Sequence, residues 1–469
     1  DQTVSVSTTD DDVAGFTVDE LDGSTEVTEA GSTDTFTVVL DAQPTSDVVL
    51  TVTSNDTGEA TVNSPLTFTP ANWDTPQTVT VTGADDGSVV DGDQTSLITI
   101  SIDDANSNDS FDAVTDQTVS VGTTDDDVAG FTIAETNGST EVDESGTTDI
   151  FTIVLDAQPT SDVLLSLSIN DNSEASVSSS LTFTPINWDS PQTVTVTGLD
   201  EETVDGIQTS TVTISVVDAV SNDSFDDVAD QTVSVSTTDD DVAGFTVVEF
   251  GGSTAVDESG TTDTFTVVLD AQPTSDVVIA LTSSDTGEAT ISGSLTFTPA
   301  NWDTPQTVTV TGVDDNLIDG TITSNISVSI IDAISDANFQ AVNDQTVSVD
   351  TTDDDVAGFT VDQLDGSVEV TEAGGTDTFT VVLDAQPVSD VVITVVSSDT
   401  GEATVNSPLT FTSANWDTPQ TVTITGIDDD LVDGTITSTI TLAVDDANAD
   451  DSFDAVADQT VSATTTDDD

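Results

Sequence analysis

The sequence predicts an all-β protein made of tandem antiparallel β-sandwiches, and three observations lead to this fold class. The hexapeptide Asp-Gln-Thr-Val-Ser-Val begins at positions 1, 116, 230 and 344, with a near copy at 458, so one unit of about 114 residues is written four times. Short segments in each unit alternate apolar and polar residues, with the period of two that is typical of half-buried strands. No segment has a helical period, and we expect almost no helix.

The repeat spacing also predicts the domain organisation. We place repeat 1 at residues 13–127, repeat 2 at 128–241, repeat 3 at 242–355 and repeat 4 at 356–469. Residues 1–12 are then the last strand of a preceding repeat, and the sequence is interpreted as an excerpt of a longer repetitive chain. Each repeat begins with Val-Ala-Gly-Phe directly after an acidic run, without the Gly/Ser spacer of a flexible linker.

Within repeat 1 the pattern predicts seven short strands. In residues 33–40, for example, Phe36, Val38 and Leu40 fall on one face. Gly, Pro, Asn and Asp separate the segments, and Val, Thr and Ile dominate them, as in strands of β-sandwiches. The expected strands are residues 13–20, 33–40, 47–53, 66–69, 78–82, 97–102 and 118–121.

One tryptophan occurs in each repeat, within an Asn-Trp-Asp-(Ser/Thr)-Pro turn. We expect each indole ring to plug the end of a sandwich or to anchor its loop, although stacking on a ligand is an alternative. The four are Trp73, Trp188, Trp302 and Trp416.

The amino-acid composition excludes several classes of function. The chain has 91 acidic residues and no Lys, Arg or His, for a formal net charge of −91, so phosphate groups would be repelled and nucleic acid is not an expected partner. It also has no Cys, Tyr or Met, which removes most general bases, thiol nucleophiles and soft metal ligands, and we predict no enzyme activity.

No apolar stretch is long enough to insert into a membrane. Because 35% of the residues are hydrophobic, a core can form, but the repelling charges require cations from solution.

Repeat 1 carries acidic residues that we expect to gather at one end of the sandwich. One follows the first strand, one lies in a Ser-Asn-Asp-Thr-Gly-Glu-Ala turn, and others lie in the loop after the fifth predicted strand and in a closing Asp triplet. The candidates are Glu20, Asp56, Asp85, Asp86, Asp91, Asp125, Asp126 and Asp127.

Calcium suits such a cluster, because it accepts six to eight oxygen ligands in irregular geometry. Magnesium is the second choice, and zinc and copper are excluded by ligand type. A plainer interpretation is that aspartate decorates turns and keeps the chain soluble. We adopt it for Asp22, Asp41 and Asp47, and favour metal for the triplets and the paired-Asp loops, since three adjacent carboxylates exceed what a turn requires.

The Phe-Thr-Val-x-Glu opening, the aspartate turn, the Asp-Asp-x-x-x-x-Asp loop and the closing Asp-Asp-Asp together resemble the Calx-β domain, in all four repeats. That family occurs in sodium–calcium exchangers, some integrin subunits and long bacterial surface proteins. The resemblance implies immunoglobulin-like sandwiches with several Ca²⁺ ions bound by acidic loops at one end.

By position, the resemblance implies further ligands in the other repeats. In repeat 4, Gln363 stands where a glutamate is expected, which implies incomplete occupancy there. The implied ligands are Glu135, Asp171, Asp200, Glu201, Asp205, Asp239, Asp240 and Asp241 in repeat 2; Glu249, Asp285, Asp314, Asp315, Asp319, Asp353, Asp354 and Asp355 in repeat 3; and Asp399, Asp428, Asp429, Asp433, Asp467, Asp468 and Asp469 in repeat 4.

These features lead us to expect a Ca²⁺-stiffened extracellular rod. Such a rod would be a secreted bacterial adhesin stalk, matrix fibre or surface filament whose partners are Ca²⁺, neighbouring repeats and possible further copies in a filament. A Ca²⁺-sensing module of a membrane transporter or receptor is one alternative, and a carbohydrate-binding surface protein is another.

Overall fold

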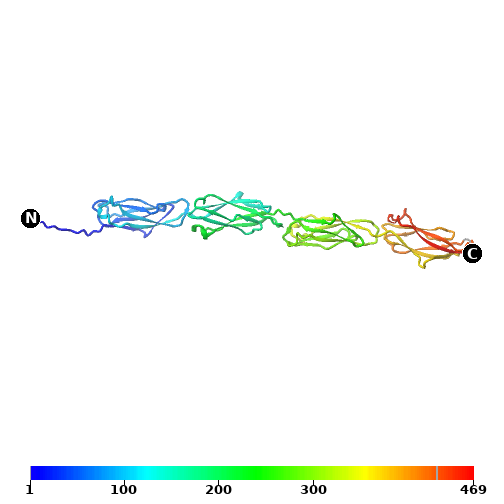
Figure 1. The fold of residues 1–469 in the computed structure, drawn as a ribbon. Helices are drawn as coiled ribbons and strands as arrows, with labels where there is room; N and C mark the ends of the chain where they lie inside the picture. Colours follow the sequence, from blue (N-terminus) through cyan, green and yellow to red (C-terminus); the bar gives the residue numbers. More distant parts are fainter. Residues whose placement is uncertain (1, 429–430, 469) are drawn as a thin grey trace. The chain divides into compact units, whose positions relative to one another are not determined.

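The computed structural model describes residues 2–428 and 431–468. By its internal contacts the chain divides into two compact units, one of residues 1–201 and 206–240, the other of residues 202–205 and 241–469 (Figure 1). Unit 1 holds the sheets of repeats 1 and 2, and unit 2 holds those of repeats 3 and 4. The repeat boundaries stated above stay predictions.

Repeat 1 is a sandwich of two sheets. One has four strands in the order β1-β3-β7-β5, and the other has five in the order β2-β10-β9-β4-β6. A single 3₁₀ turn, η1, precedes the last strand. The elements are β1 Phe16–Glu20, β2 Thr25–Thr28, β3 Thr33–Leu40, β4 Val48–Ser54, β5 Ala60–Val62, β6 Leu66–Phe68, β7 Gln77–Gly83, β8 Val89–Val90, β9 Gln94–Ile102, η1 Asp109–Phe111 and β10 Gln117–Thr124.

Repeat 2 has the same two sheets, in the orders β11-β13-β18-β16 and β12-β21-β20-β15-β17. Its elements are β11 Phe131–Glu135, η2 Thr136–Gly138, β12 Thr140–Asp143, β13 Thr148–Leu155, β14 Gln158–Pro159, β15 Val163–Ile169, β16 Ala175–Val177, β17 Ser180–Phe183, β18 Gln192–Gly198, β20 Gln208–Val216, η3 Asp218–Val220, η4 Asp223–Phe225 and β21 Gln231–Thr238.

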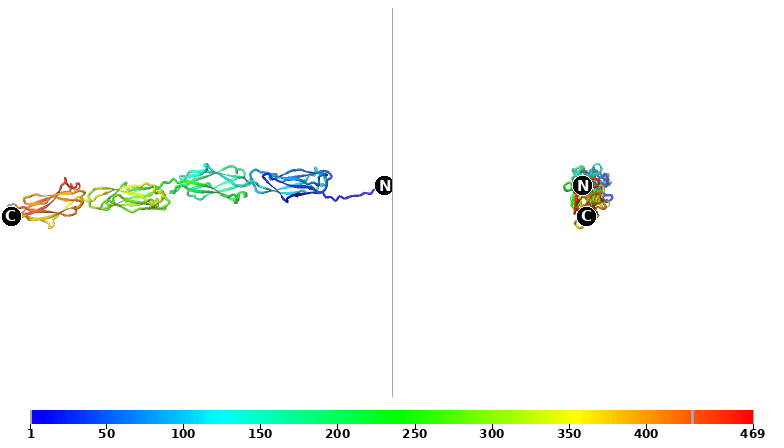
Figure 2. Two further views of the ribbon diagram at one scale, coloured as in Figure 1. Left: turned by 180° about the vertical axis from the view of Figure 1, so that it is seen from behind. Right: turned by 90° about the vertical axis from the view of Figure 1, so that its right-hand side faces the viewer.

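Unit 2 repeats this topology twice. Figure 2 shows the ribbon of its strands from behind. Its first sandwich comprises β22 Phe245–Glu249, β23 Thr254–Asp257, β24 Thr262–Leu269, β25 Gln272–Pro273, β26 Val277–Ser283, β27 Ala289–Ile291, β28 Leu295–Phe297, β29 Gln306–Gly312, β30 Ile322–Ile330, η5 Asp332–Ile334, η6 Ala337–Phe339 and β31 Gln345–Thr352; the short β19 Thr203–Val204 pairs with β25. The second comprises β32 Phe359–Asp362, β33 Val368–Thr371, β34 Thr376–Leu383, β35 Val391–Ser397, β36 Ala403–Val405, β37 Leu409–Phe411, β38 Gln420–Gly426, β39 Ile436–Val444, η7 Asp451–Phe453 and β40 Gln459–Thr466.

The predicted fold class is confirmed: the molecule is all-β, and its helical content among the described residues consists of the 3₁₀ turns η1–η7. All seven strands expected in repeat 1 are present: the one at 33–40 has the expected ends, and the others have one or both ends shifted by a few residues. Two strands of that sandwich, β2 and β5, were not predicted, because three or four residues are too short for a clear alternation. One pairing also departs from the antiparallel rule, since β2 lies parallel to β10 after the chain has crossed from one sheet to the other.

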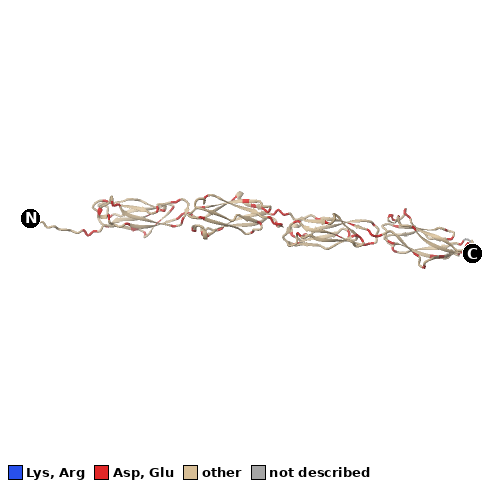
Figure 3. Ribbon diagram, viewed as in Figure 1, with Lys and Arg blue, Asp and Glu red and all other residues tan. Residues whose placement is uncertain are grey.

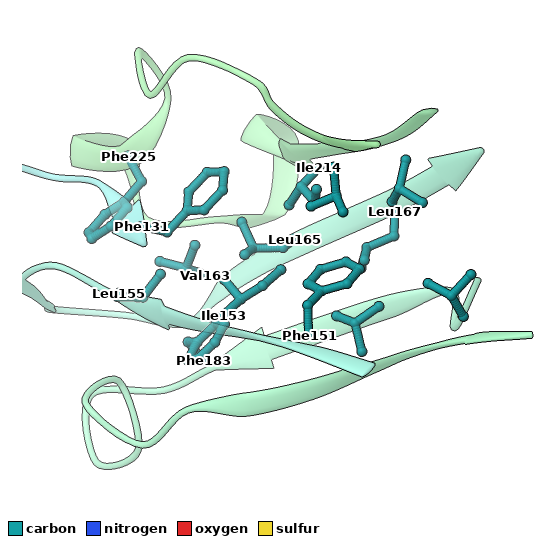
Figure 4. Packing of buried hydrophobic residues seen from close by; sticks show 14 of the residues in the cluster. Phe131, Phe151, Ile153, Leu155, Val163, Leu165, Leu167, Phe183, Ile214 and Phe225 are labelled. Carbon is teal, nitrogen blue, oxygen red and sulfur yellow. The ribbon is translucent and has the colours of Figure 1, made fainter. Parts of the chain in front are cut away.

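The core of each sandwich lies between its two sheets. In repeat 2, Phe151 and Ile153 of β13 face Leu165 of β15 and Phe183 of β17 (Figure 4). All four side chains are fully buried. Polar Thr and Ser alternate with them on the outer faces. Burying each such side chain contributes about 1.5–3 kcal/mol, so the apolar alternation supplies the stability that the net charge opposes.

The glutamine of the repeated hexapeptide ties the last strand of each sandwich to the first. Gln117 Nε2 donates a hydrogen bond to the carbonyl oxygen of Phe16, and Gln231 makes the same bond to Phe131. Because the two residues of each pair are about 100 positions apart, this contact closes a whole repeat.

Each tryptophan packs against the core of its own repeat, as expected, and is only partly buried. The carbonyl oxygen of Trp73 accepts a hydrogen bond from the Leu40 amide at 3.2 Å, so the turn is fastened to the end of β3. None of the helices in the described part of the chain has both the length and the apolar character needed to cross a membrane.

Candidate metal centre

Two glutamates in each repeat are buried at one end of the sandwich, although many other acidic residues lie in exposed loops (Figure 3). In repeat 1 these are Glu29, directly after β2, and Glu59, directly before β5, with exposed fractions of 1% and 7%. Carboxylates are rarely buried unless they are paired or bind a cation. The corresponding pairs in the other repeats are Glu144 and Glu174, Glu258 and Glu288, and Glu372 and Glu402.

The backbone around Glu29 explains why this side chain is buried. Its amide donates to the carbonyl oxygen of Thr124 at 3.1 Å, which places it beside the end of β10, where the acidic triplet begins. On the other side, a Cβ at Gly83 would lie 2.0 Å from the carbonyl oxygen of Thr28. Only glycine permits so close an approach of β7 to the end of β2, and the glycine therefore helps to bring Glu29 against Glu59.

Carboxylate oxygens from four segments of repeat 1 converge at this point. One oxygen each of Glu29, Glu59 and Asp91 lie within 4.8 Å of one another, and so do oxygens of Glu29, Asp125 and Asp127. Glu29 is common to both groups and joins them into one cluster. Like charges at these separations repel strongly unless a cation lies among them.

The charge on Glu29 is not compensated by hydrogen bonds. Both Oε1 and Oε2 are buried and accept no hydrogen bond, and the same is true of Oε2 of Glu59 and Oδ1 of Asp91. Burial, followed by the charge of Asp125, raises the pKa of Glu29 from its ordinary 4.5 to about 8. Burial and the charge of Asp91 also raise the pKa of Glu59. The surrounding protein atoms therefore do not stabilise these carboxylates in their ionised form.

Asp125 fastens the loop of residues 84–93 to the end of β10. Its Oδ2 accepts hydrogen bonds from the amides of Asp91 at 3.1 Å and Gly92 at 2.8 Å, while its Oδ1 accepts from the amide of Asp127 at 2.8 Å. In the extended triplet, Asp125 and Asp127 are half-buried and Asp126 is exposed. The alternation of side chains along an extended backbone therefore directs the first and third carboxylates to the cluster.

Repeat 3 reproduces this arrangement. Oxygens of Glu258, Asp353 and Asp355 lie within 4.8 Å of one another, and Asp353 Oδ2 accepts from the amides of Asp319 at 3.1 Å and Gly320 at 2.9 Å. Burial and then the charge of Asp353 raise the pKa of Glu258 to about 8. The same chemistry thus occurs in both units.

In repeats 2 and 4 the buried pair is again present. Oxygens of Glu144, Glu174 and Glu201 converge within 4.8 Å, and Glu144 also meets Asp239 within that distance. In repeat 4 the amide of Gly434 donates to Asp467 Oδ2 at 2.8 Å, the counterpart of the bond between Gly92 and Asp125.

The predicted ligands at the first strand have a different environment. Glu20 Oε2 accepts a hydrogen bond from the Thr25 hydroxyl at 3.0 Å, and Glu135 and Glu249 accept the equivalent bonds from Thr140 and Thr254 at 2.9 Å. The clusters described above contain none of the three. Gln363 replaces this residue in repeat 4, whose buried Glu372 and Glu402 are retained.

The predicted aspartates of the Asp-Thr-Gly-Glu-Ala turn and its counterparts are exposed and cap their own turns. Asp56 Oδ1 accepts from the amide of Gly58 at 3.0 Å, and Asp285 and Asp399 accept from Gly287 at 2.9 Å and Gly401 at 3.0 Å. Asp171 accepts from Ser173, which lowers its pKa. The charge of Asp56 still helps to raise the pKa of the neighbouring Glu59.

The remaining predicted residues lie around the clusters. Asp86 and Asp315 are exposed in their loops, and their charges contribute to the raised pKa values of Glu29 and Glu258. Asp429 and Asp469 lie outside the described residues. Also exposed are Asp85, Asp126, Asp200, Asp240, Asp314, Asp354, Asp428, Asp433 and Asp468.

The buried glutamates are the residues that sequence reasoning missed. They flank β2 and β5, the two strands that were also missed, and without those strands nothing marked the glutamates as inward-facing. A usable signal exists, since Glu59, Glu174, Glu288 and Glu402 each directly precede an alanine of the core, Ala60, Ala175, Ala289 or Ala403.

The donor set indicates what these centres can bind. It consists of carboxylate oxygens, several of them buried and lacking hydrogen-bond donors. Hard cations that prefer oxygen ligands fit such a set, whereas soft thiolate- or imidazole-seeking metals do not. Each described cluster is therefore able to hold a hard cation.

Comparison with known proteins adds little beyond the fold. The sequence matches no protein-family model, and comparison with curated proteins gives no match. Among solved structures, CBD12 from CALX1.2 is 14% identical with a TM-score of 0.19, and the match covers 42% of this chain and 78% of that one.

Two other structures span more of the chain. Domains 4–9 of the surface layer protein SbsC are 17% identical with a TM-score of 0.21, covering 93% of this chain and 61% of that one. The human desmocollin-1 ectodomain is 9% identical with a TM-score of 0.25, covering 97% and 79%. Because all three TM-scores are below 0.5, none of these similarities supports an argument about this chain.

Proposed function

We propose that this chain is a Ca²⁺-stabilised structural rod of the bacterial cell surface, acting as an adhesin stalk, matrix fibre or filament. The observation that carries the proposal is the Glu29 carboxylate, which is buried, accepts no hydrogen bond and meets Asp125 and Asp127 within 4.8 Å. A divalent cation at that point would replace repulsion among the carboxylates with coordination.

Calcium is the cation that best fits the donors and the setting. The ligands come from separate loops and have no strict octahedral arrangement imposed on them, which favours Ca²⁺ over Mg²⁺. Extracellular modules bind Ca²⁺ with dissociation constants of about 10⁻⁴–10⁻³ M, and this matches a secreted protein exposed to millimolar calcium. The absence of His, Cys, Lys, Arg and Tyr from the sequence supports a structural rather than a catalytic role.

Stiffening of the joints is supported by the loop that supplies Asp91. The preceding residue, Val90, is 5% exposed and belongs to the hydrophobic core of repeat 2, where it contacts the group that contains Phe131. An ion held by Asp91 would therefore also order the segment that joins repeat 1 to repeat 2. In this proposal the partners of the chain are Ca²⁺, the neighbouring repeats and further copies of the chain in a filament.

The direct test is calorimetric titration of the calcium-free protein with CaCl₂, followed by small-angle scattering with and without a chelator. We expect saturable binding in each repeat and a longer maximum dimension with Ca²⁺, because neutralised joints bend less. Titration with MgCl₂ serves as the control. The proposal fails if millimolar Ca²⁺ produces neither binding heat nor a change in the scattering curve.

A further inference from the structure

The tripeptide Asn-x-Ser/Thr, in which x is not proline, is the acceptor sequence for N-linked glycans, and it occurs at five places in this chain. Transfer of a glycan requires that the carboxamide nitrogen be accessible to a large enzyme and not be engaged in holding the fold. The environment of each triplet therefore determines whether it can react. The five asparagines are Asn55, Asn108, Asn137, Asn222 and Asn325.

Two of these asparagines are buried and use their carboxamide nitrogen within the fold. Asn108 is 6% exposed, and its Nδ2 donates to the hydroxyl of Thr45 at 2.6 Å. Asn222 is 5% exposed and makes the same bond to Thr160 at 2.6 Å. Both residues also cap the 3₁₀ turn that follows them. Neither nitrogen is free to attack a glycan donor.

Two further asparagines are exposed but are fastened to neighbouring strands. Asn325 lies inside β30, between β31 and β26, and its Oδ1 accepts a hydrogen bond from the Ser348 hydroxyl at 3.2 Å. The amide of Asn55 donates to the carbonyl oxygen of Leu97 at 3.1 Å, and its Oδ1 accepts from the Leu97 amide at 2.7 Å. Moving either residue into the active site of an enzyme would break these bonds.

Asn137 has a different environment, at the tip of the turn that joins β11 to β12. Residues 134–139 are all exposed, and among the described residues no hydrogen bond engages the Asn137 side chain. Its φ of 61° and the φ of 85° at Gly138 give the turn a left-handed backbone, which asparagine and glycine adopt more readily than other residues. A Cβ at Gly138 would meet no atom within 4 Å, so the space around the tip is open.

We propose that Asn137 is the attachment site of an N-linked glycan, transferred from a polyprenyl diphosphate carrier. Nδ2 of Asn137 forms a bond to the anomeric carbon of the first sugar, while the bond from that carbon to the diphosphate oxygen breaks. The lipid diphosphate leaves with the bonding electron pair, and the amide gives one proton to a base of the transferase. The exposed Ser139 supplies the hydroxyl that completes the acceptor triplet.

The position of the turn gives this glycan a structural role. β11 and β12 each lie at the end of a sheet of repeat 2, and the turn connects these two edges. An unpaired strand edge is able to pair with a strand of another chain. A bulky, hydrophilic glycan beside both edges would oppose such side-by-side pairing. This modification lies outside the carboxylate clusters of the proposed function.

The equivalent turn of repeat 1 provides a matched test. It has the same length, but Asp22 occupies the position of Asn137, followed by Gly23 and a serine. Gly23 has a φ of 85°, the same as Gly138. Asp22→Asn therefore completes an acceptor triplet in an equivalent turn. If the exposed turn is what makes Asn137 reactive, this single substitution should add a second glycan.

The test is transfer to the purified, folded 469-residue chain by a bacterial oligosaccharyltransferase that is supplied with an oligosaccharide on polyprenyl diphosphate. Asn137→Gln removes the acceptor nitrogen's position and Ser139→Ala removes the hydroxyl of the triplet. Asn55→Gln is the control at another exposed triplet, and Asp22→Asn is the gain-of-site variant. Intact mass counts the glycans, peptide mass spectrometry locates them, and circular dichroism confirms that each variant is folded.

We expect one glycan on the original chain and on Asn55→Gln, none on Asn137→Gln or Ser139→Ala, and two on Asp22→Asn. An original chain that gains no mass, while the standard acceptor peptide of the enzyme is glycosylated, overturns the proposal. Glycosylation at Asn55 in preference to Asn137 also overturns it, and so does an Asp22→Asn variant that gains no second glycan.

The role of the glycan is tested on the same material. Sedimentation velocity in millimolar CaCl₂ compares the glycosylated with the unglycosylated chain across a concentration series. We expect less association of the glycosylated chain, because the edges of β11 and β12 are covered. Equal association of the two forms overturns the shielding of these edges.

Discussion

The turn after β1 and the turn after β2 both present a glutamate, yet they place it in opposite environments. Glu20 is half-buried and accepts a hydrogen bond from the Thr25 hydroxyl at 3.0 Å. Glu29 is 1% exposed, accepts no hydrogen bond and faces three aspartates and a glutamate. The first carboxylate is satisfied by the protein itself, whereas the second requires either a proton or a cation.

This difference separates two roles that look alike in the sequence. A glutamate with a hydroxyl donor and access to water stabilises its own turn without an ion. A glutamate that has neither a hydrogen-bond donor nor access to water destabilises the ion-free fold when it is charged. A bound ion removes this cost. We therefore place the centre of the proposed calcium site at Glu29 and its counterparts.

The largest expected effect comes from removing the charge of the buried glutamates. Replacing both Glu29 and Glu258 with Gln should weaken Ca²⁺ binding in repeats 1 and 3 by about a hundredfold, because each residue is common to its cluster. The matched control, Glu20→Gln with Glu249→Gln, should leave every site within about threefold of its original affinity. Calorimetric titration measures both; equal losses in the two double variants would contradict the distinction between the turns.

The ion-free protein should lose stability as the pH rises. Glu29 and Glu258 have pKa values of about 8 in the folded state against 4.5 when unfolded, so the folded state binds more protons between these values. Their favourable contribution is complete below about 4.5 and is lost as the pH passes 8, at a cost of a few kcal/mol per repeat. Urea unfolding in a chelator at several pH values tests this.

Two controls accompany that measurement. The Glu29→Gln, Glu258→Gln variant should show a flatter pH dependence, since the amide does not titrate. Saturating Ca²⁺ should remove the decline, because the ion stabilises the charged form. A decline of equal size in the variant would assign the effect to other groups.

Calcium uptake near neutral pH should release protons. Below about pH 8 the buried glutamates are largely protonated without the ion, and coordination requires their carboxylates to ionise. The binding enthalpy should therefore vary with the ionisation enthalpy of the buffer at pH 7 and become independent of it about two units higher. No buffer dependence at either pH would show that the clusters are already ionised when free.

The smallest effect is expected at the other turn. Thr25→Val removes the hydroxyl that donates to Glu20 and should cost about 1 kcal/mol of unfolding free energy, because Thr25 is buried and its bond is not replaced. Ca²⁺ affinity should stay the same. A large loss of affinity in this variant would make Glu20 part of the ion site after all.

The strands that were predicted and those that were missed differ in length and in what marks them. Thr33–Leu40 places Phe36, Val38 and Leu40 at alternate positions on one face and was predicted with its observed ends. Thr25–Thr28 and Ala60–Val62 have one or two alternations, and their neighbours across the sheet, not their own pattern, hold them in place. The sequence shows directly that the loops are acidic. The burial of Glu29 and Glu59 beside those loops could not be predicted, because it follows from the positions of these two strands.

The sequence by itself determined the repeat period, the all-β class and the uncompensated negative charge, since these follow from local alternation and from a charge of −91 without a basic residue. Only the tertiary structure decided which carboxylates are buried together. Glu29 meets Asp125 because β2 lies parallel to β10 and Gly83 allows β7 to come close, contacts between segments far apart in the chain. Burial and proximity are properties of such long-range packing, and no local pattern encodes them.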